Sequence, residues 1–181
     1  MPELLKLFLD RIETPIGEML LTTDAAGKVR SLDWNDHEQR MSTLLDRYYG
    51  KSRYTVEPAQ NTQALRDVMK RYFAGDVAAI DEIPTEATGT AFQKSVWTEL
   101  RNIPVGTSIS YGTLAKRIER PKAVRAVGLA NGSNPIGLIV PCHRVIGANG
   151  SLTGYGGGLP RKKWLLEHER MHAKGASLFA A

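Results

Sequence analysis

The chain has little of the residue types from which disulfide frameworks and metal centres are built. It contains 181 residues but a single cysteine, Cys142, so neither an intramolecular disulfide nor a cysteine-rich zinc site can form. The histidines are too few for us to expect a histidine-built metal centre: His37, His143, His168 and His172. We therefore expect chemistry that uses no metal and no other cofactor.

Long apolar runs are also missing. No stretch reaches the roughly 18 uninterrupted apolar residues of a membrane helix, and charges interrupt the N-terminus too early for a signal peptide. The composition, 42% hydrophobic and 24% charged residues, permits a packed core and excludes an intrinsically disordered chain. We expect a soluble, cytoplasmic protein with one ordinary domain or two small ones.

Aspartate is absent from the second half of the chain, where acidic residues are few. Residues 1–90 hold 11 Lys and Arg against 15 Asp and Glu, a net charge of −4, whereas residues 91–181 hold 13 against 4, a net of +9. A basic face of this kind suits phosphate binding, because neutralising phosphates releases counterions and the field steers association. A basic surface that serves only solubility is the alternative.

The first half of the sequence carries short strand patterns followed by one helix pattern. Strands are predicted over residues 5–12, 18–23 and 29–34, because turn-forming residues separate these runs. They indicate an antiparallel meander. Residues 61–74 have the apolar spacing of an amphipathic helix, and the acidic segment over residues 75–89 is typical of a loop.

We place the domain boundary in that acidic segment. An N-terminal α/β domain is expected over residues 1–88, a C-terminal domain over residues 89–174 and a loose tail over residues 175–181. The pattern changes at Thr90, where apolar residues begin to recur every four positions. This spacing predicts a helix that ends before Pro104.

Two short helices with little between them are predicted next. Ser110 can cap a helix that runs through Ile118, and Pro121 can begin another that runs to about Asn131. Their separation is that of a helix-turn-helix. Many small helical hairpins bind nothing, so this spacing is a weak signal by itself.

The second of these helices has charged and apolar residues side by side. Lys122 and Arg125 stand beside the apolar Val124 and Val127. At helical spacing this composition allows a basic face opposite a packed one. A nucleic-acid interface is therefore a reasonable hypothesis for this helix.

The single cysteine follows an apolar run over residues 136–140, within the sequence Pro-Cys-His-Arg-Val at residues 141–145. A free thiol is only slightly ionised at neutral pH and needs a base before it can react as thiolate. His143 can serve, directly or through one water, and Arg144 adds positive potential that favours the anion. A buried small side chain beside a chance histidine is the alternative.

The glycine-rich stretch around Tyr155 suits either close approach to a ligand or a flexible loop.

The Pro-Cys-His-Arg-Val sequence resembles the active-site signature of the O6-alkylguanine-DNA alkyltransferases, or methylated-DNA–protein-cysteine methyltransferases. The resemblance continues in the family's order and spacing through Tyr111, residues 125–128, Asn134, Pro135, Tyr155, Gly157, Gly158, residues 164–166, His168 and Glu169. It covers the second half densely, and the first half resembles the bacterial Ogt-like branch. The implied fold is α+β: a ribonuclease H-like three-stranded antiparallel sheet with helices, then a mainly helical, winged helix-turn-helix-like domain.

The resemblance implies a repair protein that acts on double-stranded DNA containing O6-alkylguanine. The damaged nucleotide is flipped into a pocket. Cys142 attacks the alkyl carbon, and the stable thioether that results limits each molecule to one reaction. His143 would take the thiol proton through a water, and Glu169 would orient the histidine. We expect a monomer, with cooperative binding along DNA and activity on O4-alkylthymine as open alternatives.

Further roles follow from the same resemblance. Arg125 would be the finger that fills the space left by the flipped base, and Tyr111 would crowd the target phosphate and bond guanine N3. Tyr155 would pack the base and donate a proton, while Asn134 would act as a hinge between the recognition helix and the cysteine loop. Remaining contacts to the base or DNA are implied for the backbone of Cys142, Val145 and Gly156 and for Lys122, Ala126 and Arg144.

The sequence also departs from the family pattern. Gly156 stands where some relatives have serine, so only its amide could contact O6, and Gly137 replaces a proline of animal members, which bears on the tolerance for bulky adducts. Two other functions compete. A lesion-binding protein without chemistry would not need Cys142, His143 and Glu169. A cysteine hydrolase would use the same three residues but predicts turnover on a small acyl substrate.

Overall fold

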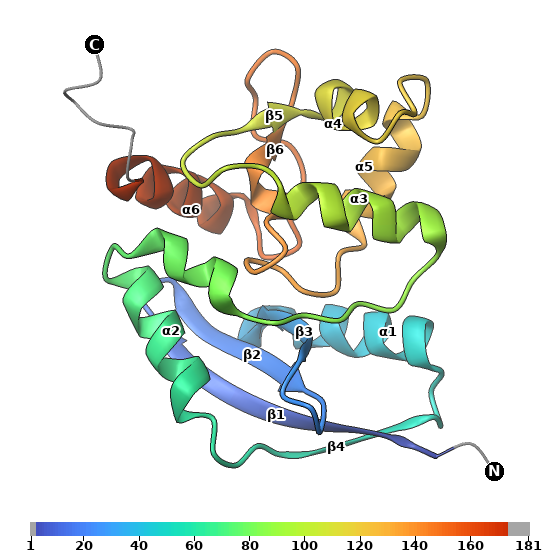
Figure 1. Cartoon of the computed structure of the whole chain (residues 1–181), viewed down its shortest axis with the longest axis vertical. Coiled ribbons are helices and arrows are strands. Elements are labelled where there is room, and N and C mark those ends of the chain that lie inside the picture. Colours follow the sequence, from blue (N-terminus) through green and yellow to red (C-terminus); the bar gives the residue numbers. More distant parts are fainter. Residues whose placement is uncertain (1–2, 174–181) are drawn as a thin grey trace.

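The computed structural model describes residues 3–173, and within this range no helix is long and apolar enough to cross a membrane. Figure 1 shows two layers of the molecule, a sheet with flanking helices below and a helical assembly above. We call them the sheet half, the residues before Ala91, and the helical half, the residues from Ala91 onward. The predicted loose tail over residues 175–181 lies outside the described residues, and the predicted domain boundary at residue 88 stays a prediction.

The sheet half is built on four strands in the order β3-β2-β1-β4. Strands β1 (Leu5–Thr14), β2 (Gly17–Thr23) and β3 (Val29–Trp34) pair antiparallel, which confirms the predicted meander. Strand β4 (Tyr54–Pro58) pairs parallel to β1 at the edge and was not predicted. Its first two residues are half-buried and the other three are exposed, so the strand lacks the alternating pattern of a half-buried strand.

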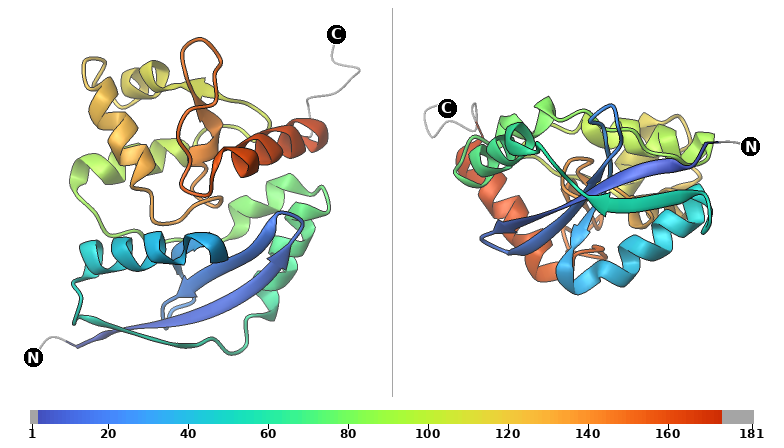
Figure 2. Two further views of the ribbon diagram at one scale, coloured as in Figure 1. Left: turned by 180° about the vertical axis from the view of Figure 1, so that it is seen from behind. Right: turned by 90° about the horizontal axis from the view of Figure 1, so that it is seen from below.

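Two helices cover opposite faces of this sheet (Figure 2). The unpredicted α1 (Glu38–Tyr49) follows a short 3-10 turn, η1 (Asn35–His37), and packs on one face, where Met41 and Leu45 meet Leu7 and Leu20. The predicted helix α2 (Gln63–Phe73) packs on the other face. Its Met69 and Tyr72 join a second core with Met19 and Leu21, so successive residues of β2 serve different faces.

The connection from α2 to the helical half is more ordered than predicted. Residues 77–82 form the 3-10 helix η2 (Val77–Glu82), whose Val77 and Ile80 are buried, so the prediction of a loop over residues 75–89 was wrong in this part. The acidic composition of this segment masked three buried apolar residues of η2, namely Val77, Ala79 and Ile80. The extended residues after η2 lead to α3 (Ala91–Arg101), which Thr90 begins with a complete capping box.

The helical half places short helices around two small strands. Ser110 caps α4 (Tyr111–Arg117) as predicted, through its hydroxyl and the Thr113 amide. Helix α5 (Val124–Gly132) begins three residues later than predicted, because Pro121 lies in a turn closed by a bond from the Ala123 amide to the Arg120 carbonyl. The other elements are β5 (Ile109–Ser110), the 3-10 turn η3 (Cys142–Arg144), β6 (Val145–Ile146) and α6 (Leu159–His172).

One hydrophobic core runs through both halves. Leu32 in β3 bridges to Ile136, and both side chains are fully buried. The same core continues through α3, α5 and Leu165 of α6. The Tyr48 hydroxyl of α1 also donates to the Ser133 carbonyl at 2.8 Å. The sheet half is therefore packed directly against the segment that delivers the cysteine.

Candidate active site and nucleic-acid interface

The cysteine is delivered by a buried segment that the sheet half holds in place. Residues 136–140 are buried apart from Gly137, whose amide donates to the Leu32 carbonyl at 3.2 Å. Cys142 follows at the start of η3 and is 6% exposed. Burial raises the pKa of its thiol, although the Asn134 side chain and the nearby positive charge of Arg40 oppose that rise. The resting group is therefore a thiol that needs a base.

His143 and Glu169 form the centre of a buried ionic network. The His143 Nε2 atom lies 2.8 Å from Glu169 Oε1. Arg144 donates to both carboxylate oxygens, from Nε to Oε2 at 2.9 Å and from Nη2 to Oε1 at 3.0 Å. All three residues are at most 1% exposed. Burial would raise the pKa of Glu169, but His143 and Arg144 hold it well below its usual range.

The network fixes which histidine nitrogen can act as a base. An ionised carboxylate only accepts hydrogen bonds, so His143 Nε2 carries the proton that bonds Glu169. The lone pair then lies on Nδ1, which is buried and has no hydrogen-bond partner. Burial lowers the pKa of His143 and outweighs the opposing pull of Glu169, so the ring is neutral and able to accept a proton.

A cavity of about 10 Å³ adjoins Cys142, enough for about one water. It is lined from both halves of the molecule, by Leu32, Asp33, Trp34, Arg40, Asn134, Gly137, Cys142, Tyr155, Gly156 and Gly157. The Tyr155 hydroxyl is buried without a partner. Burial raises the pKa of Tyr155, so this hydroxyl keeps its proton and can donate a hydrogen bond.

Asn134 ties the end of α5 to the chain that leads to Cys142. Its amide nitrogen donates to the Val140 carbonyl at 2.8 Å, and its oxygen accepts from the Ile136 amide at 2.9 Å. The side chain is 1% exposed. The role of Asn134 as a hinge stays a prediction.

Arg40 of α1 was not predicted as a site residue. Its guanidinium donates to Asp33 at 2.7 Å and to the carbonyls of Gly132 and Asn134 at 2.8 and 3.2 Å. It also packs so closely against Gly156 that a Cβ there would lie 2.5 Å from the Arg40 Cζ atom. In this chain Arg40 therefore occupies the space that a serine would need at position 156.

Lys162 of α6 was also missed. Its ammonium is fully buried and donates to the carbonyls of Val145 at 2.6 Å, Thr153 at 2.8 Å and Gly154 at 3.3 Å. These bonds join the cysteine loop to the glycine-rich loop. A lysine in a helix pattern normally predicts an exposed position, so the sequence offered no signal for this one.

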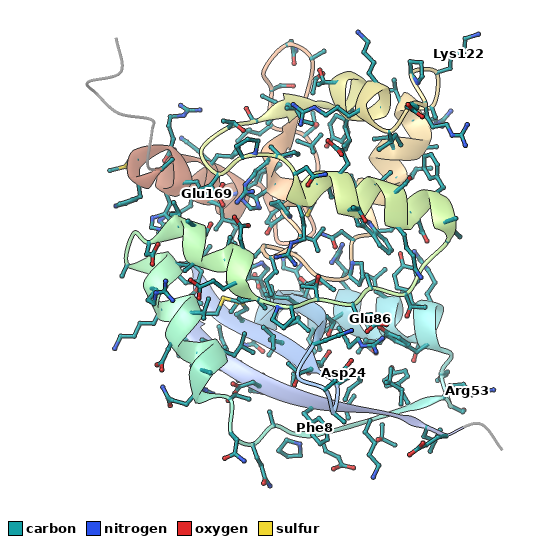
Figure 3. The ribbon with its side chains drawn as sticks, viewed as in Figure 1. Phe8, Asp24, Arg53, Glu86, Lys122 and Glu169 are labelled. Carbon is teal, nitrogen blue, oxygen red and sulfur yellow. The ribbon has the colours of Figure 1, made fainter. Side chains whose placement is uncertain are left out.

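The residues expected at a DNA surface lie on an exposed part of the helical half. Lys122 precedes α5, and Arg125 and Ala126 lie in its first turn, all exposed. Figure 3 shows Lys122 at the outer edge of the molecule and Glu169 in its interior. The prediction of a packed Val124 was wrong, because α5 begins there and turns this side chain outward at 39% exposure, whereas Val127 is buried.

Tyr111, at the start of α4, faces the glycine-rich loop. Its hydroxyl donates to the Thr153 carbonyl at 3.3 Å, and its ring lies next to Gly128 of α5. The structure therefore joins His143 and Glu169 in one buried hydrogen-bonded network, and Cys142 lies buried next to His143 in η3. Arg125 and Lys122 lie apart from that network, on the exposed surface of the helix-turn-helix.

A helix-turn-helix beside a buried cysteine, histidine and glutamate defines a nucleic-acid-binding protein with cysteine-based chemistry. Residues 91–171 match the family model described as "6-O-methylguanine DNA methyltransferase, DNA binding domain". The chain is 48% identical to a Shigella flexneri methylated-DNA–protein-cysteine methyltransferase, over 92% of this chain and 97% of that protein. A Mycobacterium tuberculosis protein of the same name is 50% identical over 72% of this chain and 79% of its own length.

Solved structures of this family also resemble the chain. The Mycobacterium tuberculosis OGT in complex with DNA superimposes with a TM-score of 0.74 at 40% identity, covering 93% of this chain and 94% of that one. The O6-methylguanine-DNA methyltransferase of Pyrococcus kodakaraensis gives 0.67 at 27% identity, over 90% and 98%. The chain belongs to the methylated-DNA–protein-cysteine methyltransferase family, DNA-repair proteins that transfer an alkyl group to a cysteine of their own.

Proposed function

We propose that this protein takes the alkyl group from O6-alkylguanine in duplex DNA onto Cys142, once per molecule. The proposal is supported by the buried thiol of Cys142, with the unpartnered His143 Nδ1 and Tyr155 hydroxyl buried in the same region and a cavity beside Cys142 that has room for the water that would carry the proton. A nucleophile, a base and a proton donor are the three groups that the reaction requires. It would act as a monomer in the cytoplasm, where a DNA substrate is accessible without translocation.

The proposed reaction begins with proton removal. His143 Nδ1 takes the thiol proton through one water, and Glu169 stabilises the resulting imidazolium. The Cys142 thiolate attacks the alkyl carbon in line, so the sulfur–carbon bond forms as the carbon–O6 bond breaks and its electron pair stays on guanine. Tyr155 donates a proton to the leaving base and is reprotonated by way of His143. The product thioether is not hydrolysed, which ends the reaction after one transfer.

The flipped base would be held mainly by backbone groups. We assign its amino group to the carbonyls of Cys142 and Val145, and O6 to the Gly156 amide. The Lys162 ammonium already bonds the Val145 carbonyl, which supports this geometry because the loop is thereby fixed before DNA binds. Removing a base from the stack costs a few kcal/mol, about the amount that several such contacts can offset.

The helix-turn-helix would place this pocket against DNA. Arg125 would enter the stack in place of the flipped base, Tyr111 would contact the target phosphate and guanine N3, and Lys122 and Ala126 would contact the backbone. Arg144, which is fully buried, is better assigned to the Glu169 network than to DNA. Its proposed part in binding is therefore indirect, through the position of the cysteine loop.

The test uses excess duplex DNA that carries one O6-methylguanine with an isotopically labelled methyl group. We expect the label on Cys142 when the protein is digested and its peptides are mapped by mass spectrometry. Lesion binding without transfer would instead indicate a protein that only recognises damage. Release of methanol with repeated turnover would indicate a hydrolase.

A further inference from the structure

The sheet half contributes a side chain directly to the histidine–glutamate network. The Tyr72 hydroxyl, from α2, donates to Glu169 Oε1 at 2.8 Å. Tyr72 and Glu169 lie 97 residues apart in the sequence, and both side chains are fully buried. None of the residues expected at the site from the sequence included a donor from this half of the chain.

The tyrosine is held in one position. Its ring packs edge-on against Phe73, with centroids 5.1 Å apart, and against His168 at 5.4 Å. The His168 Nε2 atom lies 2.8 Å from the Tyr72 carbonyl. His168 and Glu169 are consecutive residues of α6, so the same short stretch fixes both the backbone and the hydroxyl of Tyr72.

Three donors converge on one oxygen of Glu169. Oε1 accepts from Tyr72 and Arg144 Nη2 and bonds His143 Nε2 at 2.8 Å. A donor at this oxygen prevents the carboxylate from rotating away from the histidine. It also shares the negative charge, which weakens the attraction of Glu169 for the histidine proton.

We propose that Tyr72 is a positioning residue for the alkyl-transfer reaction, and that its hydroxyl holds Glu169 and sets how strongly His143 binds its second proton. The inference rests on the proposed function, because it assigns His143 as the base. It gives the sheet half a specific part in the chemistry: without touching the substrate, it adjusts the base that activates Cys142.

Other titratable groups also face this network, and some favour protonation of His143 while others oppose it. From η3 come Cys142 and Arg144, from α6 Lys162 and His168, and from the glycine-rich loop Tyr155. Arg144 and Lys162 oppose protonation of His143, and Glu169 favours it. The Tyr72 hydroxyl can be removed by a single-atom change that leaves every formal charge in place, and unlike Tyr155 it does not line the cavity at Cys142.

The experiment measures the single-turnover rate of methyl transfer at saturating DNA as a function of pH, for the wild type and Tyr72→Phe. Loss of the donor leaves Glu169 more basic, stabilises the imidazolium and raises the pKa of His143. We expect the rise of the rate with pH to move to higher pH. We also expect the plateau rate to fall about tenfold, because a tenfold change in rate corresponds to the free energy of about one hydrogen bond to a charged group.

Tyr54→Phe is the matched control, because the Tyr54 hydroxyl also donates to a carboxylate, Asp46, at 2.8 Å, and Tyr54 packs in a different core cluster from Cys142. We expect its pH profile to match the wild type. A Tyr72→Phe profile with an unmoved midpoint would overturn the proposal, and a lowered plateau alone would then mean only a structural role. Absence of transfer by the wild type would refute the proposed function instead.

A second variant protects the test against misfolding of Tyr72→Phe. Replacing Tyr72 by 3,5-difluorotyrosine keeps the hydroxyl and makes it a stronger donor. The pKa of His143 should then fall, and the pH profile should move to lower pH, opposite to the shift in Tyr72→Phe. An NMR titration that follows the Nε2 proton of His143 should give the same order of His143 pKa, highest in Tyr72→Phe and lowest in the difluorotyrosine variant. A midpoint that stays at the wild-type position would again refute the proposal.

Discussion

The two halves of the molecule differ in charge and in what they contribute to the site. Residues 1–90 carry a net charge of −4, and residues 91–181 carry +9. The helical half holds the cysteine, the histidine, the glutamate and the exposed basic residues of the helix-turn-helix. The sheet half supplies Tyr72, which bonds Glu169, and Arg40 and Trp34, which line the cavity at Cys142.

This difference separates reaction from support. The groups assigned to proton and alkyl transfer come from one basic half that can also bind phosphates. The groups from the acidic half bond carboxylates and carbonyls and hold the cysteine loop in place. Substitutions in the helical half should therefore change the reacting groups or the DNA surface themselves, whereas those in the sheet half should act indirectly, through the position and pKa of groups that the helical half supplies.

The largest effect is expected for Cys142→Ala. We predict complete loss of methyl transfer with retained binding of lesion DNA, because the base contacts assigned to residue 142 use its backbone carbonyl. Gel-shift titration and the labelled-methyl assay measure the two properties on the same preparation. Loss of both in a variant with a normal unfolding curve would contradict this division.

Glu169→Gln should have the next largest effect. It removes the anion that orients His143 and leaves the buried Arg144 uncompensated, so transfer should fall about a hundredfold or more and stability by about 3 kcal/mol. Transfer kinetics and urea unfolding measure these losses. Glu99→Gln, at a part-exposed ion pair with Arg117, is the control and should change stability by less than about 1 kcal/mol.

Glu169 also gives the protein a defined acid sensitivity. Its folded-state pKa is depressed, so its contribution to stability is present above the unfolded value of about 4.3 and is lost as pH falls below it. The slope from this one group is at most about 1.4 kcal/mol per pH unit. Urea unfolding of wild type and Glu169→Gln across this range should converge at low pH. Parallel curves would show that the carboxylate is not ionised in the folded protein.

A smaller effect tests the contact between the two halves at the cavity. Gly156→Ser should destabilise the protein by about 1–3 kcal/mol, because its Cβ would meet the Arg40 guanidinium. In an Arg40→Ala background, Gly156→Ser should lower the free energy of unfolding by less, so a double-mutant cycle should show coupling between the two positions. Additive losses in the four unfolding curves would mean that Arg40 does not occupy this space.

The smallest effects are expected at the DNA surface. Arg125→Ala should reduce base flipping, followed by fluorescence of a base analogue, about tenfold, and reduce nonspecific duplex affinity less. Lys122→Ala should lower duplex affinity without a selective loss of flipping and reduce the slope of affinity against salt by about one. Equal losses of flipping and affinity in Arg125→Ala would contradict a finger role.

Much of the fold could be predicted because its signals are local. The meander, the Ser110 cap and the helix predicted over residues 61–74 follow from turn residues, a side-chain oxygen and apolar spacing. Helix α1 also has such spacing, at Met41, Leu44 and Leu45, and could have been predicted from it. Strand β4 could not, because an edge strand with one half-buried end has no alternating pattern.

The candidate site was predictable only where residues are close in sequence or match the family pattern. The spacing of Cys142 and His143 is local, and Glu169 came from the resemblance. Tyr72 and Arg40 reach the site by bonds that join residues more than 90 positions apart. Such contacts follow from the packing of the two halves, for which a single sequence contains no direct signal.

An irreversible transfer to Cys142 can occur only once in each protein molecule. The most direct measurement titrates a fixed amount of protein with increasing O6-methylguanine DNA and counts methyl groups bound per molecule at completion. We expect a plateau at one methyl group per protein molecule, with no activity in protein that has reached it. Continued release of repaired DNA beyond one equivalent, with unmodified Cys142, would contradict it.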